Sequence, residues 1–163
     1  MDKLQEQVLE IMGEDCRIPL ERMAIMLGCE LSAVAEAIDG LERDRVILRY
    51  RPVVDWDKAH KQRVEAMIEV KVTPQRDHGF DETAKRIYGY PEVRSVYLMS
   101  GAYDLLVQVV APTLKELALF VSSKLSVVDT VTATSTSFVL KRYKQDGVLF
   151  AEEKTDQRLV ISP

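Results

Sequence analysis

A glycine, a tyrosine and an aspartate, Gly101, Tyr103 and Asp104, lie within a short stretch between two apolar segments. The flanking segments 93–99 and 103–110 predict two strands, and the small residues between them predict a hairpin turn. The tyrosine and the carboxylate then lie at the rim of a sheet, where a ligand can reach them. A carboxylate binds an ammonium group, and the free backbone N–H groups of a turn bind a carboxylate, so this combination suits a small zwitterion.

Four consecutive hydroxyl residues, at positions 134–137, occupy the middle of the predicted last strand. Two interpretations stay open. In the first, the hydroxyls line a small polar pocket beside the glycine-containing turn. In the second, the run is a solvated strand or one that faces a second copy of the chain, because threonine favours strands. Following the first interpretation, we predict an effector site made of Gly101, Tyr103, Asp104, Thr134, Ser135 and Thr136.

The histidines do not form a catalytic arrangement. His60 and His78 lie in polar segments, and neither has a neighbouring nucleophile that it could activate. The sequence has no glycine-rich phosphate loop, no nucleophile-elbow serine and no cysteine–histidine spacing typical of a metal site. We therefore expect no catalytic residue, no metal and no cofactor, and we predict that the protein is not an enzyme.

Composition places the chain among ordinary globular proteins. Of its 163 residues, 47% are hydrophobic and 29% are charged, which excludes general disorder. The net charge is −4, and the first 50 residues hold six basic and eleven acidic side chains. No apolar stretch reaches the roughly 20 residues that a membrane-spanning helix needs. Two cysteines are too few for a disulfide framework, so we expect Cys16 and Cys29 to be small buried residues of a cytoplasmic protein.

Helical periodicity dominates the first 45 residues. Apolar residues recur at helical spacing before residue 13, after Pro19 and after Ser32, which predicts three helices. Gly28 suits the end of the second helix, and Ser32 suits the N-cap of the third. Two helices joined by so short a turn are typical of a helix-turn-helix module, although any three-helix bundle gives the same periodicity. Residues 46–54 then read as an extended wing or connecting strand.

The hydrophobic period changes after a polar segment, 55–63, which we interpret as a linker. Residues 64–72 alternate between apolar and polar side chains, as in a half-buried strand. The segments that follow predict the order strand, helix, strand, strand, helix and strand, with the last strand over 130–143. This order is the split βαβ, ferredoxin-like arrangement. We therefore predict an α+β protein whose second domain spans 64–145, followed by a tail over 146–163.

In a domain of this kind both helices cover one face of the sheet and leave the other face open. We expect strand residues such as Val107 and Val139 to lie on the open face, where an exposed apolar patch is unfavourable. A second copy of the chain is the usual cover for such a face, so we predict a homodimer.

Taken together, these features resemble the Lrp/AsnC, or feast/famine, family of bacterial transcription regulators. The turn at Gly101, Tyr103 and Asp104 is similar to the Gly-x-Tyr/Phe-Asp signature of that family's effector domain. The resemblance covers about residues 1–145 and also includes Leu27-Gly28, Ser32, 41–47, 54–55, 93–98 and 138–141. It implies a winged helix-turn-helix DNA-binding domain over 1–54 joined to an effector-binding ferredoxin-like domain. It also implies homodimers that assemble further into octamers, with small-molecule sites in the clefts between effector domains.

The predicted third helix is acidic for an element that would enter a DNA groove. We expect its outward positions at Ala33, Glu36, Ala37 and Gly40. Glu36 could accept a hydrogen bond from cytosine N4 and Ala33 could touch a thymine methyl group, whereas Asp39 should repel phosphates. The arginines that follow the helix would hold phosphates. The predicted contacts to double-stranded DNA are Ser32, Ala33, Glu36, Arg43, Arg45, Arg49 and Arg51.

We therefore predict a sequence-specific DNA-binding transcriptional regulator that is controlled by a small metabolite, an amino acid. An alternative is a metabolite-binding oligomer that has lost DNA binding and acts through protein partners; the acidic third helix favours this alternative. A remoter alternative is an enzyme, because haem-biosynthetic decarboxylases are built on similar domains, but the sequence offers no basic, histidine-bearing pocket for their substrates. The intact order of helices, wing and linker favours the regulator.

Overall fold

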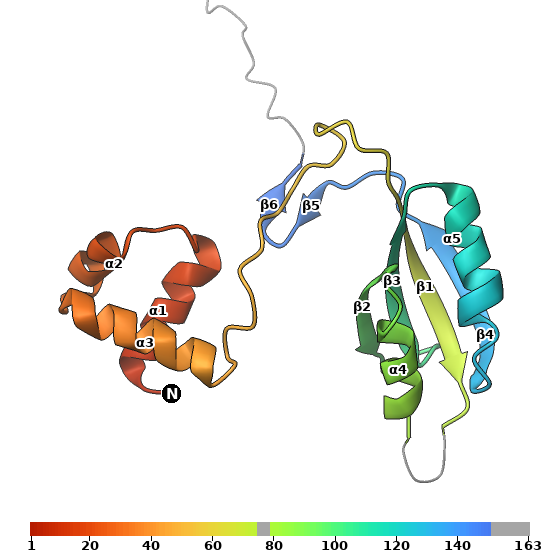
Figure 1. Ribbon diagram of the computed structural model, residues 1–163, viewed down its shortest axis with the longest axis horizontal. Coiled ribbons are helices and arrows are strands. Elements are labelled where there is room, and N and C mark those ends of the chain that lie inside the picture. Colours follow the sequence, from red (N-terminus) through yellow and green to blue (C-terminus); the bar gives the residue numbers. More distant parts are fainter. Residues whose placement is uncertain (75–78, 151–163) are drawn as a thin grey trace, which may run out of the picture. The chain divides into compact units, whose positions relative to one another are not determined.

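The change of hydrophobic period corresponds to a division of the chain into two units. The computed structural model describes residues 1–74 and 79–150, and it separates Met1–Pro52 from Val53–Pro163. Figure 1 shows helices alone in the first unit and a helix-covered sheet in the second. His78 and most of the predicted tail lie outside the described residues.

Three helices form the first unit: α1 (Lys3–Glu14), α2 (Leu20–Leu27) and α3 (Leu31–Arg43). A capping box starts α1, because the Asp2 side chain accepts from the Gln5 N–H at 2.8 Å and the Gln5 side chain accepts from the Asp2 N–H at 3.0 Å. Gly28 ends α2 in the left-handed conformation, with φ 64°, as the sequence predicts. The prediction for Ser32 is wrong: Glu30 is the N-cap residue of α3, so Ser32 already lies inside the helix.

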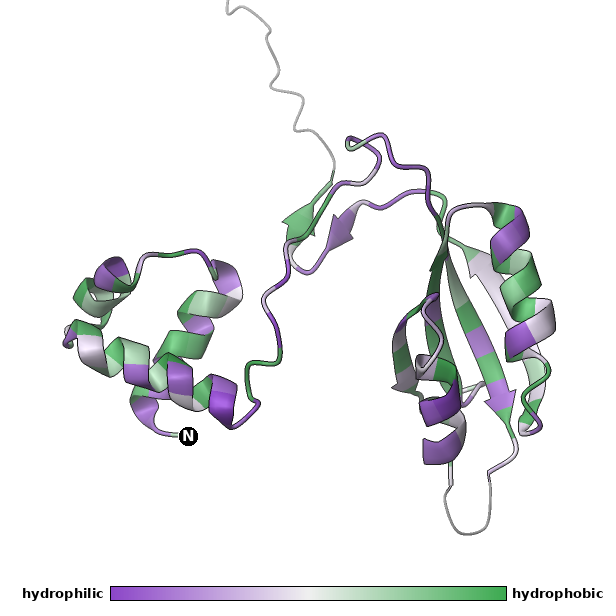
Figure 2. Cartoon of the chain, viewed as in Figure 1, coloured by the Kyte–Doolittle hydropathy of each residue, from purple (hydrophilic) through white to green (hydrophobic). Residues whose placement is uncertain are grey.

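The core of this unit is built from the inward stripe of each helix. Val8, Met23, Val34 and Leu41 are almost completely buried, and half-buried apolar residues from the helices and turns surround them. Hydrophilic and hydrophobic stretches alternate along all three helices in Figure 2, as expected for amphipathic helices that share one small core.

The residues directly after α3, 44–47, turn back onto the end of the helix. The backbone N–H groups of Val46 and Ile47 both donate to the carbonyl of Leu41, at 2.9 and 3.1 Å, and Arg45 has φ 57°. No strand is present between residues 44 and 63, a range that the structure describes throughout. The wing strand predicted over 46–54 is therefore not formed: Val46 and Ile47 cap the end of α3, and residues 48–54 belong to no strand.

The predicted linker is also folded on itself. The Asp55 side chain accepts from the N–H groups of Asp57 and Lys58, both at 3.1 Å. The guanidinium of Arg63 lies 3.7 Å from the centre of the Trp56 ring, an arrangement typical of a cation–π contact.

Cys16 is exposed and Cys29 is half-buried, so the prediction of two buried cysteines is wrong, because both lie at helix ends.

The second unit contains the predicted order of elements. The elements are β1 (Val64–Val72), α4 (Asp81–Tyr88), β2 (Val93–Leu98), β3 (Leu105–Ala111), α5 (Leu114–Phe120), a π-helical continuation η1 (Val121–Leu125) and β4 (Val131–Phe138). These four strands form one antiparallel sheet in the order β2-β3-β1-β4, which is the ferredoxin-like arrangement.

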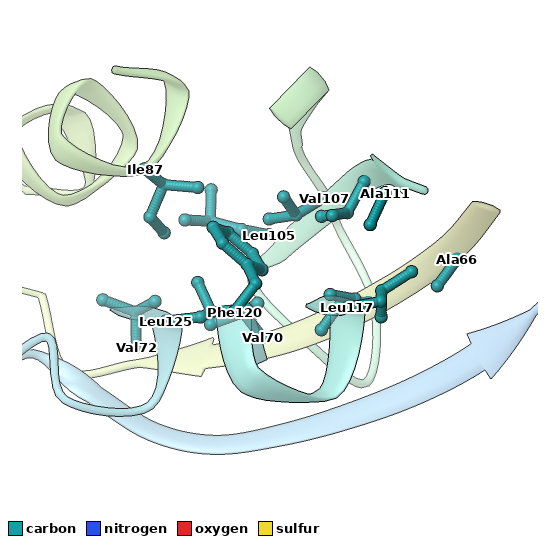
Figure 3. Packing of buried hydrophobic residues seen from close by; sticks show 12 residues of the cluster. Ala66, Val70, Val72, Ile87, Leu105, Val107, Ala111, Leu117, Phe120 and Leu125 are labelled. Carbon is teal, nitrogen blue, oxygen red and sulfur yellow. The ribbon is translucent and has the colours of Figure 1, made fainter. Parts of the chain in front are cut away.

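One face of this sheet packs against both helices. Figure 3 shows Ile87 from α4 and Phe120 from α5 close to Leu105 of the sheet. Val107 is fully buried on this helix-covered face, so its predicted place on the open face is wrong. Apolar residues lie on both sides of β3, with Gln108 the one polar side chain, and the pairing of Val107 with Ile68 of β1 places Val107 on the side that faces the helices. Val139 lies beyond the end of β4 and is partly exposed.

A small hairpin follows the sheet, where the sequence analysis placed the start of the tail. Strands β5 (Lys144–Gln145) and β6 (Val148–Leu149) pair with each other. The turn between them contains Asp146 and Gly147, both with positive φ, at 47° and 82°. Asp-Gly with this geometry is typical of a type I′ turn, so the dipeptide itself was the signal that could have predicted the hairpin.

Candidate functional site

Asp104 is tied into the sheet on several sides. Its Oδ2 accepts from the backbone N–H of Val72 at 2.8 Å, beside an irregularity in the β1–β4 pairing. Its own backbone N–H donates to the carbonyl of Val70 at 3.0 Å, and its carbonyl accepts from the N–H of Met99 at 2.8 Å. One carboxylate oxygen thus closes the end of β1, while Oδ1 makes no hydrogen bond within residues 1–74 and 79–150.

The turn beside Asp104 presents an open, partly apolar surface. Gly101 is exposed, and a Cβ added there would meet no atom within 4 Å. Tyr103 is half-buried. Tyr97 and Leu98, at the end of β2, are 53% and 63% exposed. The turn therefore combines accessible backbone with apolar side chains, which is the composition of a small-molecule subsite.

The hydroxyl run is divided between the two faces of the sheet. Thr134 and Thr136 pair with Val70 and Ile68, so they lie on the helix-covered face and are half-buried. Ser135 pairs with Glu69 and is exposed on the open face. Because β1 separates β3 from β4, Thr134 lies about two strand spacings, or ~10 Å, from Asp104 within one chain. The structure places both at the same end of the sheet, on either side of β1.

Polar side chains on the open face form a chain of contacts that the sequence analysis did not anticipate. The Ser95 hydroxyl donates to Gln108 at 3.0 Å, and the Gln108 amide donates to Glu65 at 2.6 Å. Arg142 forms an ion pair with the other oxygen of Glu65. The alternation of polar and apolar residues along β1 and β3 is the signal that could have indicated these neighbours.

The exposed face of α3 is narrower than predicted. Ser32 and Glu36 are exposed and Ala33 is half-buried, whereas Ala37 and Gly40 are buried. The placement of Ala37 and Gly40 on the outward face is therefore wrong. A Cβ at Gly40 would lie only 3.0 Å from the Gln5 side chain, because α1 crosses α3 closely at this glycine.

Exposed arginines follow α3. Arg43 belongs to its last turn, and Arg45, Arg49 and Arg51 lie in the segment after it; all four are exposed. No ion pair involves any of them in the part of the chain that the structure describes. The four cations are thus available to an external anion.

Tyr50 anchors this arginine segment to α3. Its hydroxyl donates to a carboxylate oxygen of Glu42 at 2.7 Å. Although the residue is 45% exposed, burial of the hydroxyl and the hydrogen bond to Glu42 raise the pKa of Tyr50 to about 12. The hydroxyl therefore stays protonated and keeps its hydrogen bond at neutral pH.

The described residues do not contain a metal-binding group of three or more histidine, cysteine, aspartate or glutamate side chains. His60 lies exposed in the folded linker with φ 54°. Within the same residues no helix is long and apolar enough to cross a membrane.

Comparisons with known proteins agree with this two-unit arrangement. Residues 65–149 match the family described as the Lrp/AsnC ligand binding domain. The chain is 48% identical over 160 residues to the uncharacterized HTH-type transcriptional regulator YugG of Bacillus subtilis, and the match covers 98% of this chain and 96% of YugG.

Solved structures share the fold at low sequence identity. A transcriptional regulator from Neisseria meningitidis, solved with L-Met, has a TM-score of 0.72 and 22% identity, covering 89% of this chain and 93% of that one. The feast or famine regulatory protein from M. tuberculosis, complexed with L-methionine, has a TM-score of 0.72 and 20% identity, covering 89% and 95% of the two chains.

A helix-turn-helix unit followed by a ferredoxin-like ligand-binding unit defines a class of two-domain transcriptional regulators. The chain belongs to the Lrp/AsnC family within that class. It is a helix-turn-helix transcriptional regulator with a ligand-binding domain, not an enzyme, as the sequence analysis predicts.

Proposed function

We propose that the protein binds double-stranded DNA through α3 and the arginine segment Arg43–Arg51, and that an amino acid bound near Asp104 controls this binding. The observation that carries the proposal is the row of four exposed arginines, without internal ion pairs, directly after the exposed face of α3. Several phosphate contacts are needed for useful affinity, and these side chains can supply them.

We propose that different residues make the phosphate contacts and the base contacts. Arg43, Arg45, Arg49 and Arg51 hold phosphates and position α3, but they carry no sequence information. Ser32, Ala33 and Glu36 form the base-reading surface. A carboxylate in the major groove accepts from cytosine N4, so we propose that Glu36 selects cytosine.

For the effector, the geometry suggests a site that two protomers complete. Asp104 Oδ2 is committed to Val72, so Oδ1 is the oxygen that would accept an ammonium group. Exposed backbone at Gly101 and the ring of Tyr103 would contact the rest of the ligand. Since β1 separates them within one chain, Thr134, Ser135 and Thr136 would contribute from another copy. Two relatives of this fold were solved with L-methionine, which makes it the first ligand to test.

We propose that the protein is a cytoplasmic homodimer that assembles further into octamers. The open sheet face is a mixed surface, with Met67 and Leu106 beside the polar contacts of Glu65 and Gln108. Mixed faces of this kind are typical of interfaces between copies. We propose a DNA-binding domain over 1–54, a linker over 55–63 and an effector domain from 64. We propose that the effector domain ends at 145 and that a tail over 146–163 follows it, beginning with the turn of the β5–β6 hairpin.

A second candidate is a metabolite-binding oligomer that no longer binds DNA. The observation that favours it is the acidic surface of α3, where Glu36 and Asp39 are both exposed. The two candidates differ in one measurable property, which is salt-dependent binding to duplex DNA.

The test measures binding to the upstream region of the gene by fluorescence anisotropy, over a series of salt concentrations and with and without L-methionine. The variant Arg43→Gln/Arg45→Gln should weaken binding to all sequences and reduce the slope of log affinity against log salt by about two. The matched control Lys3→Gln/Arg17→Gln removes the same charge from the same unit, outside the proposed contacts, and should leave the slope unchanged. If the wild-type protein shows no salt-dependent binding under any condition, the second candidate replaces the first.

A further inference from the structure

A groove lies between α1 and α2 in the helix-turn-helix unit, away from the exposed face of α3. It has a volume of about 480 Å³, which lies in the size range of binding sites for small molecules and short peptide segments. None of its lining residues belongs to α3 or to the arginine segment. They are Glu10, Ile11, Glu14, Asp15, Ile18, Pro19, Arg22 and Met26.

The floor of the groove is apolar and preformed. Ile11 and Ile18 pack against the core with one side and line the groove with the other. Met26 contributes a side chain that is 57% exposed. The turn between the helices is held by the bond from the Asp15 N–H to the Ile11 carbonyl, at 3.0 Å, and from the Ile18 N–H to the Asp15 carbonyl, at 3.3 Å. A partner therefore meets this surface without refolding it.

The rim is acidic. Its charged residues are three carboxylates, Glu10, Glu14 and Asp15, and one cation, Arg22. The last turn of α1 contains no basic residue, so Glu14 and Asp15 lie at the negative end of the helix dipole, where carboxylates are unfavourable. No ion pair relieves them in the described parts of the chain. Bringing a cation to this rim would remove an unfavourable charge arrangement that the isolated unit retains.

Charge and shape together select the kind of partner. DNA is repelled by the carboxylates, and a polyamine would leave the apolar floor uncovered. The eight residues of α2 extend over ~12 Å, which equals about two turns of an opposing helix. We propose that this groove, named here the α1–α2 groove, binds a short basic amphipathic helix of another protein, with Leu-type side chains on the floor and Lys or Arg on the rim. This inference is independent of the effector and of the DNA contacts.

The test uses the full-length protein and a fluorescent 14-residue helical peptide of leucine and lysine with one apolar face. Met26→Gln and Glu14→Gln should each weaken peptide binding by about fivefold to tenfold, because each removes a contact from a small interface. Ile25→Gln and Glu21→Gln are the matched controls. Ile25 is 82% exposed and Glu21 is also exposed on α2, yet neither lines the groove, so both should change affinity by less than twofold.

Three further measurements decide the result. Affinity should fall as salt rises, since the rim contributes electrostatically. A peptide of the same composition with its apolar face scrambled should bind at least about tenfold more weakly. The proposal is overturned if the controls weaken binding as much as the groove variants, if the scrambled peptide binds equally well, or if spermidine displaces the helical peptide with comparable affinity. Far-ultraviolet circular dichroism checks that every variant is folded.

Discussion

Three carboxylates of the sheet unit have partners within the fold, whereas two on the exposed face of α3 have none in the part of the chain that the structure describes. In the sheet unit, Asp104 accepts from a backbone N–H of β1, Glu65 pairs with Arg142, and Glu92 pairs with Lys124 of η1 at 2.5 Å. On the exposed face of α3, Glu36 and Asp39 make no hydrogen bond or ion pair within the described residues. A carboxylate with an internal partner stabilises the fold, whereas an unpartnered one sets the charge that a binding partner meets.

The largest expected effect on stability comes from Asp104. Asp104→Ala should lower the free energy of unfolding by about 1–3 kcal/mol, because it leaves the Val72 N–H without its acceptor. Asp104→Asn keeps an acceptor oxygen and should lose about half as much. Urea unfolding followed by circular dichroism measures both.

Asp129→Ala is the control for this substitution, since Asp129 is exposed, and it should change stability by less than about 0.5 kcal/mol. If Asp104→Ala leaves the unfolding midpoint unchanged but weakens binding of L-methionine, then Asp104 acts in ligand binding and does not stabilise the fold through Val72.

A smaller, pH-dependent effect is expected at Glu92. Burial raises the pKa of this carboxyl group. Hydrogen bonds from Lys124 and from its own backbone, together with the charge of Lys124, lower the pKa by a larger amount, so the net pKa lies below the ordinary value. A depressed folded-state pKa stabilises the fold above the unfolded-state pKa, and this contribution is lost as pH falls through the folded-state value. The stability difference between wild type and Glu92→Gln should therefore shrink as pH falls from 7 to about 3.

Because both partners are partly exposed, that difference should stay below about 1 kcal/mol even at neutral pH. Glu36→Gln gives the matching measurement for a carboxylate without an internal partner among the described residues, on the exposed face of α3. A pH-independent difference for Glu92→Gln would show that the ion pair contributes nothing to folding.

The smallest effect on stability is expected at Glu36 itself, within about 0.5 kcal/mol for Glu36→Gln. Its effect should instead appear in DNA binding. Removing one negative charge from the exposed face of α3 should strengthen binding to duplexes without cytosine at the contacted position, and the preference for cytosine there should fall by about 1–3 kcal/mol. Anisotropy titrations with duplexes that differ at single positions measure both. An unchanged preference for every base would remove Glu36 from the base-reading surface.

The sequence predicted those features that repeat along an element. The alternation in β1 and the order of the later segments were sufficient for the ferredoxin-like topology, and Gly28 marked the end of α2 because only its left-handed backbone fits there. Features that depend on register were missed. Strand β3 has apolar residues on both sides and only Gln108 as a polar one, so its sequence indicates only weakly which side faces the helices. The pairing with β1 places Val107 on that side.

Tertiary contacts explain the remaining errors. Ser32 is a good N-cap residue, but the N-cap of α3 is Glu30, two residues earlier, and capping preference alone rarely fixes a boundary to a single residue. Gly40 fell on the predicted outward face because the close approach of α1 is not visible in the sequence. The hydroxyl run at 134–137 was recognised as unusual, yet its division between two faces follows only from the pairing of β4 with β1.

The folded linker gives the protein an optical reporter of its own. Trp56 is the only tryptophan of the chain, and it lies in the segment between α3 and β1, with the Arg63 guanidinium stacked on its ring. Its emission therefore reports on this segment alone, because the chain has no other tryptophan. A shift in emission wavelength on adding DNA or an amino acid would report a rearrangement of this segment. An unchanged spectrum would indicate that Arg63 stays stacked on Trp56 when either ligand binds.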